Sequence, residues 1–187
     1  MKQRSTRTIL PSLESTGTVF MHNGKVFHAS HEGVHVLRFT GDIRYTLSPP
    51  LECFIEQLFA GEKPRGFIID LCEVVSIDST NLGLMAGIAN QMHNAENSRV
   101  TIICDQLDIN ELLASMGFDD VFDIVNSRMD VDMEEEEIQL EKPQSATMSR
   151  TILKAHRTLM ALNETNRELF RDVVTLLEKN DAGDSTD

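Results

Sequence analysis

Tryptophan is absent from this chain of 187 residues and tyrosine occurs once, so aromatic residues make up only 5% of it. Hydrophobic residues still reach 41%, which predicts a globular domain with an aliphatic core and argues against a disordered chain. No apolar run is long enough to span a bilayer, and the basic N-terminal stretch lacks the apolar segment of a signal peptide. We therefore expect a soluble, cytoplasmic protein without a membrane partner.

Residues that bind metals or form disulfides are few. The odd number of cysteines and the lack of C-x-x-C spacing argue against a disulfide framework and a zinc site; the residues are Cys53, Cys72 and Cys104. His28, His31 and His35 cluster in sequence, but on a hairpin their side chains need not converge, and no cysteine or carboxylate completes a ligand spacing. We expect reduced thiols, no metal and no cofactor.

Basic residues are in the minority, 17 against 30 acidic ones, so the formal net charge is -13. Only the first 25 residues carry more basic than acidic side chains, 4 against 1. Residues 26–129 carry 6 against 15, and residues 130–187 carry 7 against 14. An acidic body repels the phosphates of nucleic acids, so we expect protein partners and no nucleic acid.

Apolar periodicity predicts one α/β domain over residues 25–129. Two β-prone runs, 25–30 and 34–43, are separated by three turn residues and predict a hairpin. Helical and strand-like periods then alternate, with helices at 51–60, from 82 onward and at 109–116, and strands at 67–72, 99–105 and 120–125. The order β-β-α-β-α-β-α-β predicts a mixed β-sheet whose later strands pair in parallel through right-handed crossovers.

Local sequence also predicts how the helix at 109–116 begins and ends. Asp108 and Glu111 have the spacing of a capping box, which satisfies free backbone N–H groups at a helix start. Gly117 follows the last apolar residue of the helix, where a left-handed cap is expected, and Phe118 can then pack back on the helix.

The segments outside this domain differ from it in composition. Residues 1–24 mix polar and small residues and predict a flexible arm. Residues 130–146 predict an acidic linker, in which the run Glu134 to Glu137 is interpreted as a solvated spacer, with a basic partner as the alternative. Residues 180–187 predict a disordered tail.

A heptad pattern covers the C-terminal region. Residues alternate at spacings of four and three in the series Met148, Ile152, Ala155, Leu159, Leu162, Asn166, Leu169, Val173 and Leu176. The pattern predicts one continuous amphipathic helix over residues 147–179, with Asn166 as a polar residue that sets register. A second apolar row consists of Leu153, Met160 and Val174, and Phe170 and Leu177 lie at a further heptad position. We expect this helix to self-associate, to fold back on the domain or to bind a second protein.

Four polar residues, Asp78 to Asn81, interrupt the apolar pattern between a strand and a helix. Ser79 or Thr80 is well placed to cap the helix by accepting a hydrogen bond from a free backbone N–H group. A helix N-terminus also tolerates a phosphate, because its N–H groups and dipole favour negative charge. Gly83 and Gly87 lie four residues apart and predict close approach of another backbone, either of the domain's own sheet or of a partner.

The sequence "FIIDLCEVVSIDSTNLGLMAGI", together with the preceding hairpin and the downstream "RVTIICD" and "INELLASMGFDDVFDIV", resembles the STAS domain of bacterial anti-sigma factor antagonists. In that family a strand leads to a D-S-[ST]-G-[LIVM]-G motif that opens a helix. Residues 78–83 match this motif, with Asn81 in place of the first glycine. The resemblance implies that Ser79 is phosphorylated by a partner that is both serine kinase and anti-sigma factor, with Thr80 as a secondary site.

The resemblance also implies a non-enzymatic partner switch. The unphosphorylated domain would bind the anti-sigma factor and release a sigma factor, phosphorylation would reverse this, and a PP2C-type phosphatase would restore binding. The implied partner-binding residues are Asp78, Ser79, Thr80, Asn81, Leu82, Gly83, Met85, Ala86 and Gly87.

Two alternatives belong to other classes. One is a STAS scaffold or adaptor subunit of a signalling or transport complex, without phosphorylation switching. The other is a small hydrolase that uses Ser79 and a histidine. The hydrolase is disfavoured because the sequence has no G-x-S-x-G motif and places no histidine near this helix start.

Overall fold

The computed structural model describes residues 23–96, 98–126, 134–139 and 145–183. Nearly all of the predicted N-terminal arm, 1–24, lies outside these residues, as do parts of the predicted linker and the end of the predicted tail. Among the described residues, no helix combines the length and apolar character that crossing a bilayer requires.

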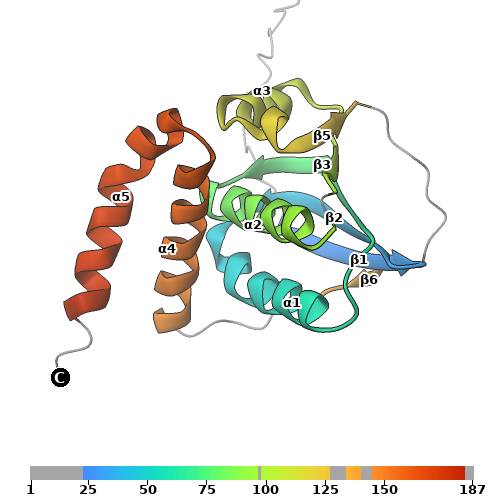
Figure 1. Cartoon of the computed structure of the whole chain (residues 1–187), viewed down its shortest axis with the longest axis horizontal. Coiled ribbons are helices and arrows are strands. Elements are labelled where there is room, and N and C mark those ends of the chain that lie inside the picture. Colours follow the sequence, from blue (N-terminus) through green and yellow to red (C-terminus); the bar gives the residue numbers. More distant parts are fainter. Residues whose placement is uncertain (1–22, 97, 127–133, 140–144, 184–187) are drawn as a thin grey trace, which may run out of the picture.

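A six-stranded mixed sheet forms the centre of the fold, with strand order β5-β4-β3-β2-β1-β6 (Figure 1). Its strands are β1 Lys25–His31, β2 Val34–Ile43, β3 Gly66–Ile77, β4 Val100–Ile103, β5 Phe122–Val125 and β6 Glu136–Glu137. Strand β1 is antiparallel to β2 and β6, whereas β2 to β5 pair in parallel. The predicted mixed sheet is therefore confirmed.

Helices alternate with the strands as the periodicity predicted. They are α1 Ser48–Ala60, α2 Ser79–Glu96, α3 Leu107–Ser115, α4 Ser145–Leu162 and α5 Glu164–Gly183, with short 3₁₀ turns η1 Tyr45–Leu47 and η2 Phe118–Asp120. The predicted order β-β-α-β-α-β-α-β is present from β1 to β5. Helix α5 continues to residue 183, so the backbone of residues 180–183, predicted as disordered tail, is helical.

The hairpin between β1 and β2 depends on its turn residues. His31 pairs with Val34, which leaves Glu32 and Gly33 as a two-residue loop. Both have positive φ, 50° and 82°, which matches the right-handed twist of the flanking strands. Glycine adopts this conformation without strain, so the sequence contains the residue that this turn favours.

The core lies between the sheet and the helices that cover one of its faces. Along β3 the buried side chains alternate at Phe67, Ile69 and Leu71 and resume at Val74 and Ile77. The change of phase accompanies shifts in the pairing of β2 with β3, typical of a β-bulge. Leu82, Met85 and Ile88 of α2 are buried against this face, so the helix that follows Asp78 is an integral part of the core.

The predicted capping box of α3 is wrong. The helix begins at Leu107, its cap residue is Gln106 without a side-chain capping bond, and Asp108 lies within the first turn. The side chain of Gln106 instead donates to the carbonyls of Leu71, Cys72 and Val74 on β3. Gly117 does have the predicted left-handed conformation, with φ 73°, and Phe118 is fully buried.

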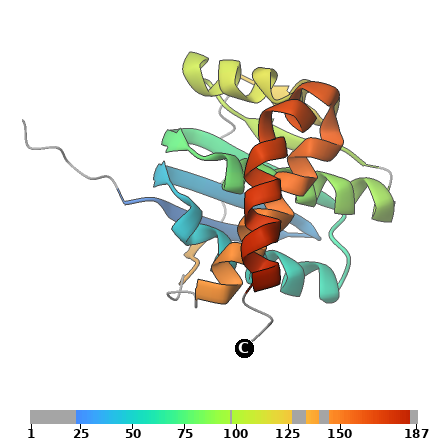
Figure 2. The same ribbon diagram turned by 90° about the vertical axis from the view of Figure 1, so that its left-hand side faces the viewer.

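The single helix predicted over 147–179 is also wrong, because the chain turns at Asn163 and forms the α4–α5 hairpin. The side-chain oxygen of Asn163 accepts a hydrogen bond from the backbone N–H of Asn166 at 2.8 Å and caps α5. In both views α4 lies between α5 and the domain (Figures 1 and 2). Helix α4 thus packs on the domain, and folding back on the domain was one of the three predicted outcomes.

The heptad series is divided between different environments. Ala155 and Leu159 of α4 are buried, whereas Leu169, Val173 and Leu176 of α5 are 57%, 40% and 61% exposed. Leu153 and Val174 of the second row are buried instead, and so is Phe170. The helix turns because the capping residues at 163–166 favour a new start, and the hairpin buries Phe170 and Val174 of α5 while the apolar heptad residues of α5 stay exposed.

The acidic linker is more ordered than predicted where the structure describes it. Glu136 and Glu137 form β6 and pair with His28 and Phe27 of β1. Lys25 contacts Glu137 at 2.8 Å. The interpretation of 134–137 as a solvated spacer is therefore wrong for its backbone, although all four glutamates remain exposed.

Candidate functional site

Asp78 organises the junction between β3 and α2. One of its carboxylate oxygens accepts from the backbone N–H of Asn81 at 3.1 Å and from the side-chain amide of Asn81 at 3.0 Å. The other accepts from the backbone N–H of Tyr45. Asp78 is therefore the capping residue of α2, and the prediction that Ser79 or Thr80 caps the helix is wrong. Aspartate suits this position because its charge complements the helix dipole.

Ser79 is the first residue of α2, and its hydroxyl faces α4. Its Oγ lies 3.0 Å from Nε2 of His156, a residue 77 positions further along the chain. Nδ1 of His156 lies 2.8 Å from the carbonyl oxygen of Ile152 and must donate to it, because a carbonyl only accepts. In the neutral imidazole Nε2 then accepts, so the hydroxyl of Ser79 is the donor.

His156 is itself held in the interior. It is 5% exposed, and its ring meets that of Phe170 of α5 edge to face, with centroids 5.1 Å apart. The structure thus places a histidine beside Ser79, contrary to the reasoning that disfavoured a hydrolase. Because Nδ1 faces a main-chain carbonyl, the pair lacks the carboxylate that orients the histidine of a catalytic triad.

The residues after Ser79 are mostly buried. Thr80 is 4% exposed and Asn81 is completely buried. Asn81, which occupies the position of the family glycine, uses its amide to bind the Asp78 carboxylate. It therefore supports the cap rather than offering a side chain to a partner. Because so little of Thr80 is exposed, a kinase has little access to its hydroxyl.

Gly83 is the point of closest approach between α2 and α4. A Cβ atom built on Gly83 would overlap the carbonyl group of Ala155 and lie 2.7 Å from its Cβ. No heavy atom lies within 4 Å of a Cβ built on Gly87. The predicted close approach is thus present at Gly83, where the neighbour is α4 and not the sheet, and absent at Gly87.

Charged contacts flank this helix pair. Lys154 of α4 lies 2.6 Å from Glu52 and 2.8 Å from Glu56 of α1. Burial opposes the charged form of Lys154, but hydrogen bonds to the two glutamates raise its pKa. Thr151 donates to Glu52 at 2.5 Å. Only about 40 Å³ of free space remains between α1, α2 and α4, so α4 fills this groove.

Of the predicted partner-binding residues, six are buried and three are partly exposed. Thr80, Asn81, Leu82, Gly83, Met85 and Ala86 are buried in the core or beneath α4. Asp78, Ser79 and Gly87 are partly exposed.

A larger cavity of about 380 Å³ lies at the other end of α2, beside His93, Arg99 and Asp120, and none of the predicted site residues lines it.

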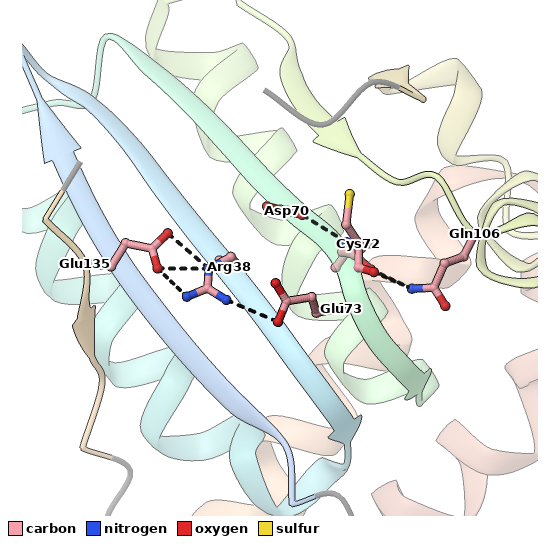
Figure 3. A network of polar contacts seen from close by, with 7 residues as sticks. Arg38, Asp70, Cys72, Glu73, Gln106 and Glu135 are labelled. Carbon is pink, nitrogen blue, oxygen red and sulfur yellow. Dashed lines mark hydrogen bonds and ion pairs between the residues drawn. The ribbon is translucent and has the colours of Figure 1, made fainter. Parts of the chain in front are cut away.

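A second polar network crosses the face of the sheet that is turned away from α1 and α2 (Figure 3). Arg38 contacts Glu135 through a two-nitrogen fork and Glu73 at 3.5 Å, and its hydrogen bonds to Glu135 raise its pKa. Burial, followed by the hydrogen bond and charge of Asp70, raises the pKa of Cys72 to about 12. This network therefore contains a two-nitrogen ion pair and a thiol whose charged form is disfavoured.

Two of the three clustered histidines converge. Nε2 of His28 and Nδ1 of His35 are 3.0 Å apart and the rings stack, with centroids 5.3 Å apart. Burial, and then the charge of His35, lowers the pKa of His28, and burial lowers that of His35. Within the described ranges, no group of three metal-ligating side chains comes together.

His156 and Lys154 are the site residues that sequence reasoning missed. Their contacts depend on a helix far along the chain, so the sequence near Ser79 carries no indication of them. The turn at Asn163 was recognisable in principle, since Asn163, the acidic Glu164 and Asn166 form a helix start. A fold-back at that position would have directed attention to α4.

Comparisons with known proteins agree with this architecture. The family model described as STAS domain matches residues 28–131, more than half of the chain. A crystal structure of an anti-sigma factor antagonist from Mycobacterium paratuberculosis is similar to the fold, with a TM-score of 0.50 and 21% identity, over 56% of this chain and 87% of that one. A search of the curated proteins found no significant match. With its mixed sheet, the Asp78-capped helix and the matched family model, the chain belongs to the STAS domain family.

Proposed function

We propose that this STAS protein is an anti-sigma factor antagonist that acts in the cytoplasm as a phosphorylation-controlled partner switch. The unmodified domain binds an anti-sigma factor that is also a serine kinase, and a sigma factor is released. Phosphorylation of Ser79 reverses this, and a PP2C-type phosphatase restores binding. Thr80 is the secondary acceptor, and because it is only 4% exposed its modification would require the start of α2 to be uncovered. The protein works by binding and not by catalysis.

The observation that carries the proposal is the position of Ser79. It is the first residue of α2 and follows the capping Asp78, in the motif 78–83 that resembles the family's phosphorylation motif. A phosphate would add about -1.5 to -2 charges beside Asp78 on a chain of net charge -13. Repulsion and desolvation would then oppose docking of a partner that binds the unmodified surface.

Phosphopeptide mapping of the protein incubated with its kinase and ATP tests the modification. We expect phosphate on Ser79 and loss of it in Ser79→Ala. Phosphate at other residues only would contradict the assignment. Neighbouring genes for an ATPase-type serine kinase and a phosphatase identify the proteins to use.

A binding assay with the anti-sigma factor tests the switch. Ser79→Ala should bind like the unmodified protein and Ser79→Asp should lose binding at least tenfold. Ser30→Asp is the matched control, since Ser30 is an exposed serine on β1, far along the chain from Ser79. Equal binding of Ser79→Ala and Ser79→Asp would contradict the switch.

The second candidate function is a STAS scaffold or adaptor without switching. The hydrogen bond between the Ser79 hydroxyl and His156 favours it, because the hydroxyl already has a partner within the molecule and the residue is only partly exposed. A stable complex isolated from cells with Ser79 unmodified under all growth conditions would support this function.

A further inference from the structure

We propose that the α4–α5 hairpin occupies the surface of α2 to which the protein partner docks, and that the partner must displace it. We further propose that the partner presents a basic helix with a small residue facing Gly83, as α4 does. The inference rests on the proposed function, because it takes the start of α2 as the docking site.

Helices α2 and α4 approach each other closely at Gly83. Gly83 leaves room for the backbone of α4 at Ala155, and any side chain there would overlap it. If α4 moves away from α2, the apolar and small side chains that it now covers become exposed. A replacing helix that docks as closely as α4 does needs a small residue at the contact with Gly83.

The second argument is access to Ser79. Its hydroxyl donates to the buried His156, whose ring is held in turn by Phe170 of α5. A phosphate on this oxygen would replace the hydrogen that Ser79 donates to His156, so the modified side chain would lose this contact with α4. Modification of Ser79 and close docking over its hydroxyl therefore both compete with the contact that holds α4 at this position.

The third argument is charge. Helix α4 carries Arg150, Lys154 and Arg157 and no acidic residue, in a chain of net charge -13. Of these residues, Lys154 binds Glu52 and Glu56 of α1 and Arg157 binds Glu178 of α5, while Asp78 lies immediately before α2. A partner that takes the place of α4 must neutralise the same glutamates of α1, which a basic helix does.

Topology permits the displacement. All six strands of the sheet come from residues before 138, so the hairpin contributes no strand. Its contacts are with α1, α2, the end of α3 and itself. Removing the hairpin leaves the order of the sheet unchanged, and the partner recovers the apolar burial that is lost.

The test uses the full chain and a substitution on α4, so that the surface of α2 stays unchanged. Ala155→Leu places a bulky side chain against Gly83 and should release the hairpin. Ala161→Leu is the matched control, since Ala161 is an exposed alanine of the same helix. Circular dichroism establishes that both variants are folded.

The first readout is thiol labelling of Ser79→Cys in a Cys53→Ser background. Cys53 is the exposed native thiol, Cys72 is partly exposed and Cys104 is buried. The rate at the added thiol is the excess over that of the Cys53→Ser protein in which Ser79 is retained. Ala155→Leu should label at least about tenfold faster than Ala161→Leu. Equal rates would overturn the inference.

The second readout is affinity for the anti-sigma factor, measured by titration calorimetry. Ala155→Leu should bind at least about tenfold tighter than Ala161→Leu. If the two bind equally while Ser79→Asp still abolishes binding, the inference fails and the proposed switch stands. If Ala155→Leu binds tighter but Ser79→Asp has no effect, the hairpin inference stands and the switch fails.

A second variant covers the case in which Ala155→Leu does not fold. Lys154→Glu places a third carboxylate beside Glu52 and Glu56, and Arg150→Glu makes the same charge change at another exposed position of α4. Faster labelling in Lys154→Glu, reversed by adding Glu56→Lys, supports the inference. No difference from Arg150→Glu overturns it.

Discussion

Two segments follow strand β5 in the chain, and they pack on the domain in different ways. The acidic segment 134–139 attaches through a two-residue strand and through ion pairs whose side chains are 21–50% exposed. The α4–α5 hairpin attaches through buried apolar residues, including Leu159 and Phe170, which join the central core. Exposed ion pairs contribute little to stability, whereas each buried leucine contributes several kcal/mol.

The comparison teaches that attachment to the domain does not make a segment part of its cooperative unit. The acidic segment can detach with little loss, and its contacts weaken as salt rises. The hairpin buries apolar side chains in addition to making the Lys154 ion pairs, so its release costs more and depends less on salt. If the hairpin is displaced as proposed, the protein that displaces it has to replace this buried surface.

The largest expected change in the free energy of unfolding comes from a substitution in the buried face of the hairpin. Leu159→Ala should lower the free energy of unfolding by about 2–5 kcal/mol, because Leu159 is fully buried and its removal leaves a cavity. Leu169→Ala, at a residue that is 57% exposed, should change it by less than about 0.5 kcal/mol. Urea denaturation measures both, and equal effects would show that the hairpin does not pack in solution.

Substitution of Asn166 should have the second-largest effect on the free energy of unfolding. Its side-chain amide donates to the carbonyls of Met116 at 2.9 Å and Leu159 at 3.1 Å, and so ties the hairpin to the end of α3. Asn166→Ala should cost about 1–3 kcal/mol, because it leaves these carbonyls without that donor. Thr165→Ala, at the neighbouring exposed residue, is the control for the same urea experiment. A loss no larger than that of the control would exclude this anchoring role.

The contact between Ser79 and His156 should be smaller and specific. A double-mutant cycle with Ser79→Ala and His156→Ala should give a coupling of about 0.5–1.5 kcal/mol, the usual contribution of one hydrogen bond. The cycle subtracts the packing that each substitution loses on its own. Additive effects in urea denaturation would mean that α4 does not bind Ser79.

The acidic segment should show the smallest effect. Glu135→Gln removes the charge that Arg38 binds and should cost less than about 1 kcal/mol at low salt. The difference should shrink further in 1 M NaCl, where the Debye length is about 3 Å. Glu134→Gln, at an exposed residue one position earlier, is the control. A large, salt-independent loss would place this segment in the same class as the hairpin.

Much of the domain was predictable because its elements are encoded locally. The apolar run at 67–72 and the helical spacing from Leu82 onward depend on neighbouring residues, and both elements formed as predicted. The cap of α2 was predicted one residue too late, because Asp78, Ser79 and Thr80 are all good capping residues and local preference does not choose among them. The roles of these residues in binding and phosphorylation stay predictions.

Sequence by itself determined the mixed sheet, the hairpin turn at Glu32 and Gly33, and the place of Ser79 at a helix start. Each follows from side chains within a few positions. Tertiary structure alone decided that α4 covers Ser79 and that Gly83 receives Ala155. The heptad series was compatible with self-association, with folding back on the domain and with binding a second protein. The cap at Asn163, and the burial of Leu159, Phe170 and Val174, selected a hairpin packed on the domain.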